Sequence, residues 1–277
     1  MKPFFSVIIP TLNEELFLPS LLNDLKGQKS KNFEVIIVDA KSKDKTRKIA
    51  KNYIKNLKLK IFISNKKSVS YQKNMGAKKA KGRYLLFIDA DSRINSKFIK
   101  SLKKVIYSKK DLVYLPSIVP EEKTPQFKLV YQVVNYLVQI SQNTKRPLST
   151  GGCMVLERNF FNKIKGFNEE VFNAEDHSII QKAKLFGEKA IFLKRVKRTE
   201  SFRRMNKEGK FQYLYKISLG VLHTIFKGEI KEKIFEYEMG GHLYTQQEIN
   251  KYKLRSVLNK NESDKMKAYF KNIFFKY

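Results

Sequence analysis

Two aspartates directly follow an apolar segment in "YLLFIDADSRI", residues 84 to 94. Asp89 and Asp91 stand two positions apart, and such side chains project to the same side of an extended chain, so both carboxylates can converge beyond a strand end. Carboxylate oxygens suit Mg²⁺ or Mn²⁺, which usually completes its coordination with water and substrate phosphates. The pair predicts a metal site for a nucleotide diphosphate, and a plain polar turn is the alternative.

A second acidic pair, Glu175 and Asp176, opens the helical pattern "EDHSIIQKAKLFG". A carboxylate near the hydroxyl of a second substrate can take its proton as general base, which is typically worth ~10² to 10⁴-fold in rate. The positive end of a helix also favours carboxylates for structural reasons, and both roles can hold together. A lone histidine more often lies on the surface or supports the reacting residues than acts as a catalyst, so we assign no catalytic role to His177, His223 or His242.

Short apolar runs alternate with segments of helical period, which is typical of an α/β sheet. Runs that are apolar throughout indicate strands covered on both faces, and strand-helix-strand crossovers favour parallel pairing. Ligands of such sheets bind at the carboxyl ends of the strands, where Asp39 and Asp89 both lie. The predicted strands are residues 4–10, 33–40, 59–64, 84–90, 112–117 and 149–157.

Three segments are predicted to be helical. The first has Asn13 as N-cap, acids at Glu14 and Glu15, and one apolar face formed by Leu18, Leu21, Leu22 and Leu25. The second is the long segment 124–142, and the third is the region from about 205 to 277, which carries helical patterns and no strong strand. We therefore treat 205–277 as a helical extension packed on the first domain.

Four ordered stretches share a known pattern: "VIIPTLNEE", "VIIVDAKSKDKT", "YQKNMGAKKAKGRYLLFIDAD" and "STGGCMVLERNFFNKIKGFNEEVFNAEDHSIIQKAKLFG". Together they resemble the inverting GT-A glycosyltransferases of family 2, over residues 5 to about 200. The resemblance implies a GT-A fold, which is a Rossmann-like, mostly parallel sheet flanked by helices, with the C-terminal helical extension added here. The expected domain is 1–204, with a nucleotide half at 1–115 and an acceptor half at 116–204, followed by the extension at 205–277.

The resemblance also assigns roles to residues. Asp39 is expected to face the base, Asp91 to bind the metal, and Asp89 to contact the ribose or the metal. Lys73 stands where a basic residue can meet the diphosphate, although a solvated helix face is an equal alternative. Asp176 is the expected general base, with Glu175 beside it. The full set of expected nucleotide contacts is Pro10, Thr11, Asn13, Glu14, Asp39, Lys73, Asn74 and Asp89.

Departures from the family pattern limit what the resemblance implies. The stretch "DAKS" after Asp39 lacks the usual glycine, so the base is left open. The chain has no tryptophan, which excludes the Q-x-x-R-W signature of processive synthases and favours transfer of a single sugar. The S-K-containing segment of dolichyl-phosphate mannose synthases is also missing, so a polyprenyl-phosphate acceptor is an alternative rather than the leading prediction.

The amino-acid composition limits which binding partners and which cellular compartment the sequence fits. The 277 residues carry a formal charge of +31, from 57 Lys+Arg against 26 Asp+Glu, spread along the chain. Composition drift and attraction to an anionic membrane or substrate both fit this spread better than nucleic acid, whose binding surfaces concentrate their charge. The single Cys153 suits a reducing compartment, and no signal-like or membrane-spanning segment is present. We expect a cytoplasmic protein, peripheral on the inner face of the membrane, without a nucleic-acid partner.

Two further segments bear on function. The basic segment 193–210 contains Arg203 and Arg204, either of which can close over a leaving diphosphate, with a solvated loop as the alternative. The next segment, 211–226, is too short to span a membrane and suits either contact with lipid headgroups or packing on its own domain. At helical spacing its shared apolar face is Phe211, Leu214, Tyr215, Leu222 and Ile225.

The sequence therefore predicts an enzyme: a metal-dependent inverting glycosyltransferase of the hexosyl type that moves one sugar from a nucleotide-diphosphate sugar. The acceptor is expected to be a hydroxyl or phosphate of a cell-surface glycan or a lipid-linked glycan precursor. Two alternatives remain open. One is a polyprenyl-phosphate glycosyltransferase. The other is a basic membrane- or nucleic-acid-binding protein without catalysis.

Overall fold

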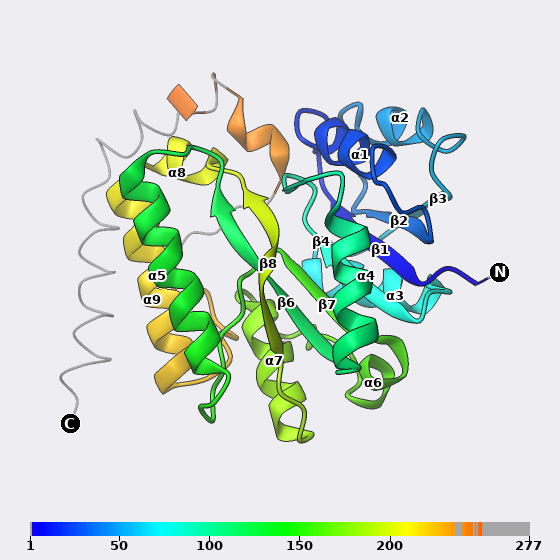
Figure 1. Ribbon diagram of the computed structural model, residues 1–277. Coiled ribbons are helices and arrows are strands. Elements are labelled where there is room, and N and C mark those ends of the chain that lie inside the picture. Colours follow the sequence, from blue (N-terminus) through cyan, green and yellow to red (C-terminus); the bar gives the residue numbers. More distant parts are fainter. Residues whose placement is uncertain (1, 236–239, 246, 248, 251–277) are drawn as a thin grey trace.

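A single eight-stranded sheet organises the protein, with the strand order β3-β2-β1-β4-β7-β6-β8-β5. The computed structural model describes residues 2–235, 240–245, 247, 249 and 250. Figure 1 shows the N-terminal strands on one side of the molecule and two long helices, α5 and α9, together on the other. The strands are β1 (Phe5–Thr11), β2 (Phe33–Asp39), β3 (Leu59–Ile63), β4 (Tyr84–Ile88), β5 (Arg93–Ile94), β6 (Val113–Pro120), β7 (Cys153–Glu157) and β8 (Ile191–Glu200).

Hydrophobic clusters cover both faces of the sheet. Val7 and Ile9 of β1 belong to the cluster that includes α1 and α4, whereas Ile8 belongs to the cluster that includes α6 and α7. This alternation explains why β1 and β2 are buried along their whole length and have no polar face. The helices are α1 (Leu18–Lys26), α2 (Thr46–Lys51), α3 (Val69–Lys79), α4 (Phe98–Lys109), α5 (Pro125–Ser141), α6 (Arg158–Lys163), α7 (Glu175–Leu185), α8 (Arg203–Glu208), α9 (Lys210–Phe226) and the 3₁₀ helix η1 (Gly241–Tyr244).

The first four strands of the nucleotide half are parallel to one another, as the sequence predicts. β1 pairs in parallel with β2 and β4, and β2 with β3. The register sets Thr11 opposite Asp39, so the polar ends of the two strands meet at one edge. Parallel pairing therefore brings the predicted nucleotide residues together.

The acceptor half contains the antiparallel pairs of the otherwise mostly parallel sheet. β7 is antiparallel to both β4 and β6, and only β6 and β8 pair in parallel. The sequence does not predict β8, because the basic residues of "IFLKRVKRTE" obscure its apolar positions and the pattern indicates only a basic segment over 193–210. Only part of this strand is buried, which permits that composition.

The start of the first helix also differs from the prediction. α1 begins at Leu18, after Phe17, and Asn13 lies five positions earlier with a left-handed φ of 52°. Asn13 belongs to a loop instead: its N–H donates to Ser42 Oγ at 2.8 Å, and its Oδ1 accepts from Lys43 N at 2.7 Å. The predicted N-cap is therefore wrong, because the polar side chain bridges two loops. The predicted apolar face of four leucines is confirmed, since all four are fully buried.

Part of the chain beyond residue 204 lies against the loops of the nucleotide half. η1 lies against the loop after β1, where Gly241 N donates to Leu12 O at 3.1 Å. The Asn13 amide lies 3.0 Å from His242 Nδ1. In the described part of this region, helix η1 therefore lies beside the nucleotide half. Helix α8 also lies there, because its Arg203 pairs with Glu14 and Asp91. Among the described residues, no helix has both the length and the apolar character that a membrane crossing needs.

The core packing generates a stability prediction. Leu22 of α1 is fully buried, whereas Leu16 in the preceding loop is 52% exposed. Leu22→Ala should lower the free energy of unfolding by about 2–5 kcal/mol, because it removes apolar contacts and leaves a cavity. Leu16→Ala is the matched control and should change it by less than about 0.5 kcal/mol. Urea denaturation measures both, and equal losses would contradict the assignment of this helix face to the core.

Candidate active site

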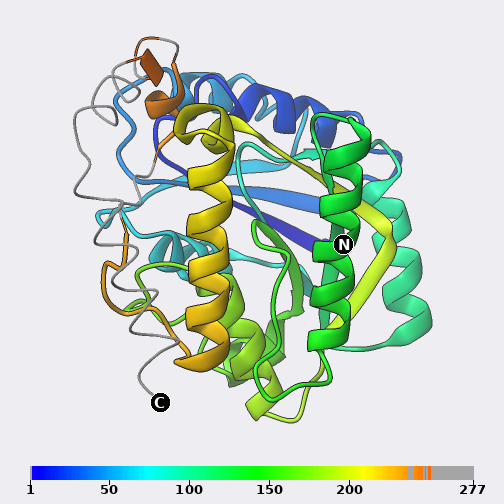
Figure 2. The same ribbon diagram turned by 90° about the vertical axis from the view of Figure 1, so that its left-hand side faces the viewer.

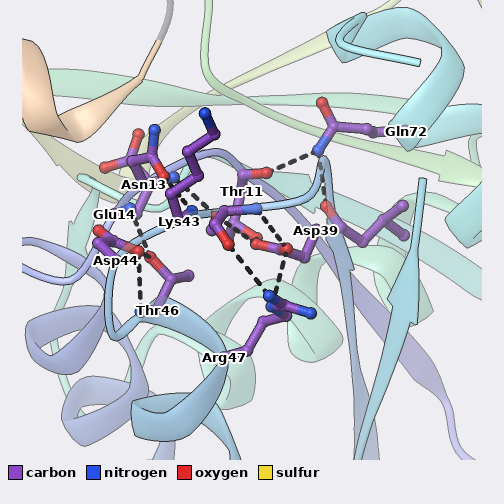
Figure 3. Close-up of polar contacts among 11 residues, drawn as sticks. Thr11, Asn13, Glu14, Asp39, Lys43, Asp44, Thr46, Arg47 and Gln72 are labelled. Atoms are coloured by element: carbon purple, nitrogen blue, oxygen red, sulfur yellow. Dashed lines mark hydrogen bonds and ion pairs between the residues drawn. The ribbon is translucent and has the colours of Figure 1, made fainter. Parts of the chain in front are cut away.

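A network of hydrogen bonds closes the ends of β1 and β2 (Figure 3). Asp39 is fully buried and accepts from Thr11 Oγ1 at 3.0 Å, from Ser42 N at 2.9 Å and from Ser42 Oγ. Arg47 Nε adds an ion pair at 3.6 Å. Gln72 of α3 donates to the carbonyls at the strand ends, and its bond to Thr11 O measures 3.0 Å. These bonds fix the loop shape, because each strand end is held by a neighbouring element.

The position of Asp39 bears on the predicted contact with the base. A carboxylate offers about four lone-pair sites, and Thr11, Ser42 and Arg47 together already use both oxygens of Asp39. The side chain is also absent from the cavity wall formed by its neighbours Pro10 and Thr11. Three hydrogen bonds from Thr11 and Ser42 leave about one of these lone-pair sites, and base recognition by Asp39 stays a prediction.

Glu14 is a buried acid on the wall of the same cavity. Burial raises the pKa of Glu14 to about 7, although the Arg203 guanidinium opposes the shift. Arg203 Nη1 donates to Glu14 Oε2 at 2.6 Å, and Arg203 Nε lies 2.8 Å from Asp91 Oδ2. The guanidinium also lies 4.8 Å from the ring centres of both Phe17 and Tyr244. One arginine therefore connects the predicted nucleotide loop to the predicted metal ligand.

The two aspartates follow β4 in a tight turn, in which Ser92 N donates to Asp89 O at 3.0 Å. Burial raises the pKa of Asp89 to about 6, against the opposing effect of the Lys73 ammonium. The donors fit a magnesium or manganese ion in kind, because both are hard carboxylate oxygens. In the described part of the chain no cluster of three or more acidic, His or Cys ligands exists, so water and substrate would have to supply the remaining oxygens.

Lys73 lies between the members of the second acidic pair. Its side chain is 1% exposed, and its Nζ donates to Glu175 Oε1 and to Asp176 Oδ1, both at 2.8 Å. A solvated helix face for Lys73 is therefore wrong. Burial alone would raise the pKa of Asp176, but Lys73 and the Gly152 N–H hold that pKa below its usual range. Asp176 is thus ionised near neutral pH.

Gly152 holds the two acidic pairs next to each other. Its N–H donates to Asp176 Oδ2 at 2.7 Å, and its carbonyl accepts from Asp89 N at 2.9 Å. Its φ is +53°, and an added Cβ would lie 2.9 Å from Asp89 Oδ2. Only glycine fits this position without displacing an acid. The sequence signal was the Gly-Gly in "STGGC", to which no role was assigned.

Arg198 of β8 is a second residue that the sequence did not identify. It is 3% exposed and donates to Gly151 O at 3.1 Å, and its other nitrogen lies 3.4 Å from Ser92 Oγ. Its hydrogen bond to the Gly151 carbonyl therefore helps to hold the Gly151–Gly152 turn in place. Because β8 was not predicted, nothing in the sequence indicated that this arginine faces the site.

Two residues at or near the predicted site, Asn74 and His177, have structural partners. Asn74 donates to Phe167 O at 2.9 Å and accepts from Phe167 N at 2.9 Å, so it holds the G-F-N-E loop rather than facing the nucleotide cavity. His177 Nδ1 accepts from Ser149 N at 2.9 Å, and burial lowers its pKa. A nucleotide contact by Asn74 therefore stays a prediction.

Two cavities meet at the acids. One has a volume of about 340 Å³ and includes Pro10, Thr11, Glu14 and Gln72 in its wall. The other has a volume of about 280 Å³ and extends to β8 and α9. The residues common to both walls are Asp89, Asn173, Glu175, Arg203 and Arg204.

Solved structures identify the fold as GT-A. The structure of S. aureus TarS 1-349 in complex with UDP-GlcNAc matches with a TM-score of 0.59 and 23% identity, over 80% of this chain and 67% of that chain. The mannosyltransferase PcManGT from Pyrobaculum calidifontis, in complex with GDP-Man and Mn2+, matches with a TM-score of 0.66 and 17% identity, over 96% and 72% of the two chains.

The chain belongs to glycosyl transferase family 2, whose model matches residues 6–165. A segment of 100 residues, 35% of the chain, is 38% identical to poly(ribitol-phosphate) beta-N-acetylglucosaminyltransferase TarS of Staphylococcus aureus. Another match, 37% identical over 33% of the chain, is a PGL/p-HBAD biosynthesis glycosyltransferase of Mycobacterium bovis. These segments span only 18% and 37% of the lengths of the two relatives.

The buried ion pairs of Lys73 generate a prediction. Lys73→Met leaves Glu175 and Asp176 without their cation, and breaking a buried pair typically costs about 3–5 kcal/mol. The free energy of unfolding should fall by about that amount at pH 7. The loss should shrink towards pH 5, because the unpaired carboxylates become protonated.

Lys78→Met on the same helix is the control, since Lys78 is exposed. It should change the free energy of unfolding by less than about 0.5 kcal/mol. Denaturation curves at pH 5 and pH 7 measure both variants. A pH-independent loss in Lys73→Met would show that packing, and not charge pairing, makes Lys73 important.

Proposed function

We propose that this protein is a metal-dependent inverting glycosyltransferase of the hexosyl type that transfers a single sugar from a nucleotide-diphosphate sugar. One observation carries the proposal: two cavities share a wall that contains Asp89 and Glu175, one from each acidic pair. A donor in one cavity and an acceptor in the other would meet beside these acids. The named ligands of the related structures, UDP-GlcNAc and GDP-Man, support a nucleotide-sugar donor.

The donor would occupy the cavity beside Pro10, Thr11 and Glu14, with its diphosphate towards the end of β4. Asp91 and Asp89 would hold Mg²⁺ or Mn²⁺, which supplies positive charge to the diphosphate oxygens when bound. The Mn2+ named in the PcManGT complex supports this cofactor. The sugar and the base stay open, because the related structures carry two different bases.

Asp176 is the proposed general base. Inversion requires the acceptor hydroxyl to attack the anomeric carbon from the face opposite the leaving diphosphate, and that hydroxyl must lose its proton. Asp176 is kept ionised by Lys73 and lies on the wall of the second cavity. Lys73 and Gly152 each donate to one of its oxygens, which fixes the carboxylate in one orientation. A fixed, ionised carboxylate is what proton acceptance needs.

Arg203 is the proposed diphosphate contact, with Arg204 beside it on both cavity walls. In the structure, Arg203 forms ion pairs with both Glu14 and Asp91. Arg203 would pair with the diphosphate through two parallel N–H groups, while a cation held by Asp91 would supply further positive charge there. The guanidinium would thus offset the negative charge that develops on the leaving diphosphate as its bond to the sugar breaks.

The acceptor is proposed to be a hydroxyl or phosphate of a cell-surface or lipid-linked glycan, and the protein to work at the inner face of the membrane. The name of TarS includes poly(ribitol-phosphate), a polymer with hydroxyl and phosphate groups, and supports a hydroxyl or phosphate acceptor. The formal charge of +31 supports attraction to an anionic surface. A polyprenyl-phosphate acceptor is the second candidate, and a binding protein without catalysis is the candidate from another class.

A donor screen tests the function and the metal together. The protein with Mn²⁺ should release nucleotide diphosphate from one of a set of UDP-, GDP- and dTDP-sugars. Asp91→Asn and excess chelator should each abolish release, because the cation loses its ligand or is removed. Asp111→Asn, which alters an acid outside both cavity walls, should retain activity. Full activity of Asp91→Asn would remove the metal proposal, and nucleotide binding without any turnover would favour the binding protein.

The general base has its own test. Asp176→Asn should lower kcat by about 10² to 10⁴-fold, with donor affinity nearly unchanged, because the variant keeps its shape and loses the proton acceptor. Glu175→Gln is the matched variant, since it also removes one carboxylate partner of Lys73, and it should do less harm. A collapse of donor affinity in Asp176→Asn would place this residue in the nucleotide site instead.

The diphosphate contact is tested by alanine at Arg203 and Arg204 together. The double variant should lower kcat by about 10²-fold or more and weaken binding of the free nucleotide diphosphate, because guanidinium forks are lost. Arg195→Ala in β8 is the control, since Arg195 is exposed and lies outside both walls. Unchanged nucleotide affinity in the double variant, measured by titration calorimetry, would limit both arginines to a structural role.

A further inference from the structure

Helices α5 and α9 form one side of the molecule and run in the same direction (Figures 1 and 2). Side chains link them at both ends. Near their N-terminal ends, Lys210 Nζ lies 5.2 Å from the centre of the Phe127 ring. At the other end, Arg146 of the loop that follows α5 donates through Nη1 to Ile225 O of α9 at 2.8 Å. The two helices therefore present a joint surface, here called the α5–α9 face.

The outward side of α5 carries apolar side chains, whereas the solvent-facing side of a helix is usually polar. Its buried side already contributes Tyr131 and Val138 to the interior. Leu129 and Tyr136 are each 62% exposed, and α9 adds Phe226 at 59%. Contiguous exposed apolar residues of this kind mark a contact surface. The exposed apolar residues of the α5–α9 face are Leu129, Val130, Val133, Val134, Tyr136, Leu137, Ile140, Leu214, Ile217, Ile225 and Phe226.

The charges within the two helices have one sign. Neither α5 nor α9 contains an aspartate or glutamate. Glu121 and Glu122 precede α5, and Glu121 is engaged by Phe202 N. The exposed basic residues within the helices and at their ends are Lys128, Lys145, Arg146, Lys210 and Lys227. A second copy of this chain would bring the same positive charges together, whereas an anionic surface would attract them.

The α5–α9 face continues into the site. Ile217 is 44% exposed and also lines the cavity that contains Asp176 and Glu200. Tyr213, Gly220 and Val221 of α9 line the same cavity. α9 is therefore at once part of the apolar face and a wall of the proposed acceptor cavity.

We propose that the α5–α9 face docks on an anionic lipid bilayer and presents a membrane-anchored acceptor to the cavity behind α9. The apolar side chains would enter the boundary between headgroups and acyl chains, and the basic residues would pair with lipid phosphates. This inference rests on the proposed function for the acceptor, while the docking surface itself stands on exposure and charge. It extends the membrane contact predicted for 211–226 to α5, whose exposed side the sequence did not reveal.

Vesicle co-sedimentation of the full chain tests the surface. The wild type should bind vesicles of phosphatidylcholine with phosphatidylglycerol, bind pure phosphatidylcholine far less, and be released by salt because the attraction is screened. The double variant Leu129→Gln with Tyr136→Gln should bind at least tenfold more weakly. Leu185→Gln with Phe186→Gln is the matched control, because it alters an exposed aliphatic and aromatic pair at the end of α7, and should bind like the wild type.

Three outcomes would overturn the proposal. The wild type could stay in the supernatant with anionic vesicles at low salt, or the α5 double variant could bind as well as the wild type. In the third outcome, the wild type is a dimer without vesicles and the α5 variant a monomer, which makes a second copy the occupant. Release of nucleotide diphosphate from a soluble donor should be equal in the wild type and both double variants. Vesicle binding needs no donor, so it decides the surface whether or not the glycosyltransferase proposal holds.

Discussion

The Lys73 ammonium, buried between Glu175 and Asp176, is the interaction on which the site depends. An unpaired charge in the interior is costly, so a lysine from α3 and two acids from α7 are each tolerated only because the others are present. The pairing joins two elements about a hundred residues apart in the chain. It thereby fixes the acceptor half against the nucleotide half and keeps Asp176 ionised.

Gly152 completes this arrangement at backbone level. Its N–H reaches Asp176 and its carbonyl reaches Asp89, so one residue sets the spacing between the two acidic pairs. The left-handed backbone and the close approach of Asp89 leave no room for a side chain. Arg198 then supports the neighbouring Gly151 from β8, so the acceptor half of the sheet also helps to position the two acidic pairs.

Arg203 connects this centre to the rest of the chain. Next to the rings of Phe17 and Tyr244, it forms ion pairs with both Glu14 and Asp91 and so places a positive charge beside the predicted metal ligand. Because Tyr244 comes from the region after the sheet, the extension contributes directly to the proposed donor cavity. The same region supplies α9, which lines the proposed acceptor cavity on one side and forms part of the α5–α9 face on the other.

The sequence by itself determined the α/β class, the parallel nucleotide half and the positions of both acidic pairs. Buried strands and strand-end acids have local signatures: a continuous apolar run, followed by a polar turn. Only the tertiary structure decided that β7 is antiparallel, that Asn13 bridges loops, that Lys73 is buried between acids, and that Arg198 and Gly152 hold the centre. The physical reason is that the role of a charged or polar side chain depends on the partners that desolvate or neutralise it, and those partners come from distant elements.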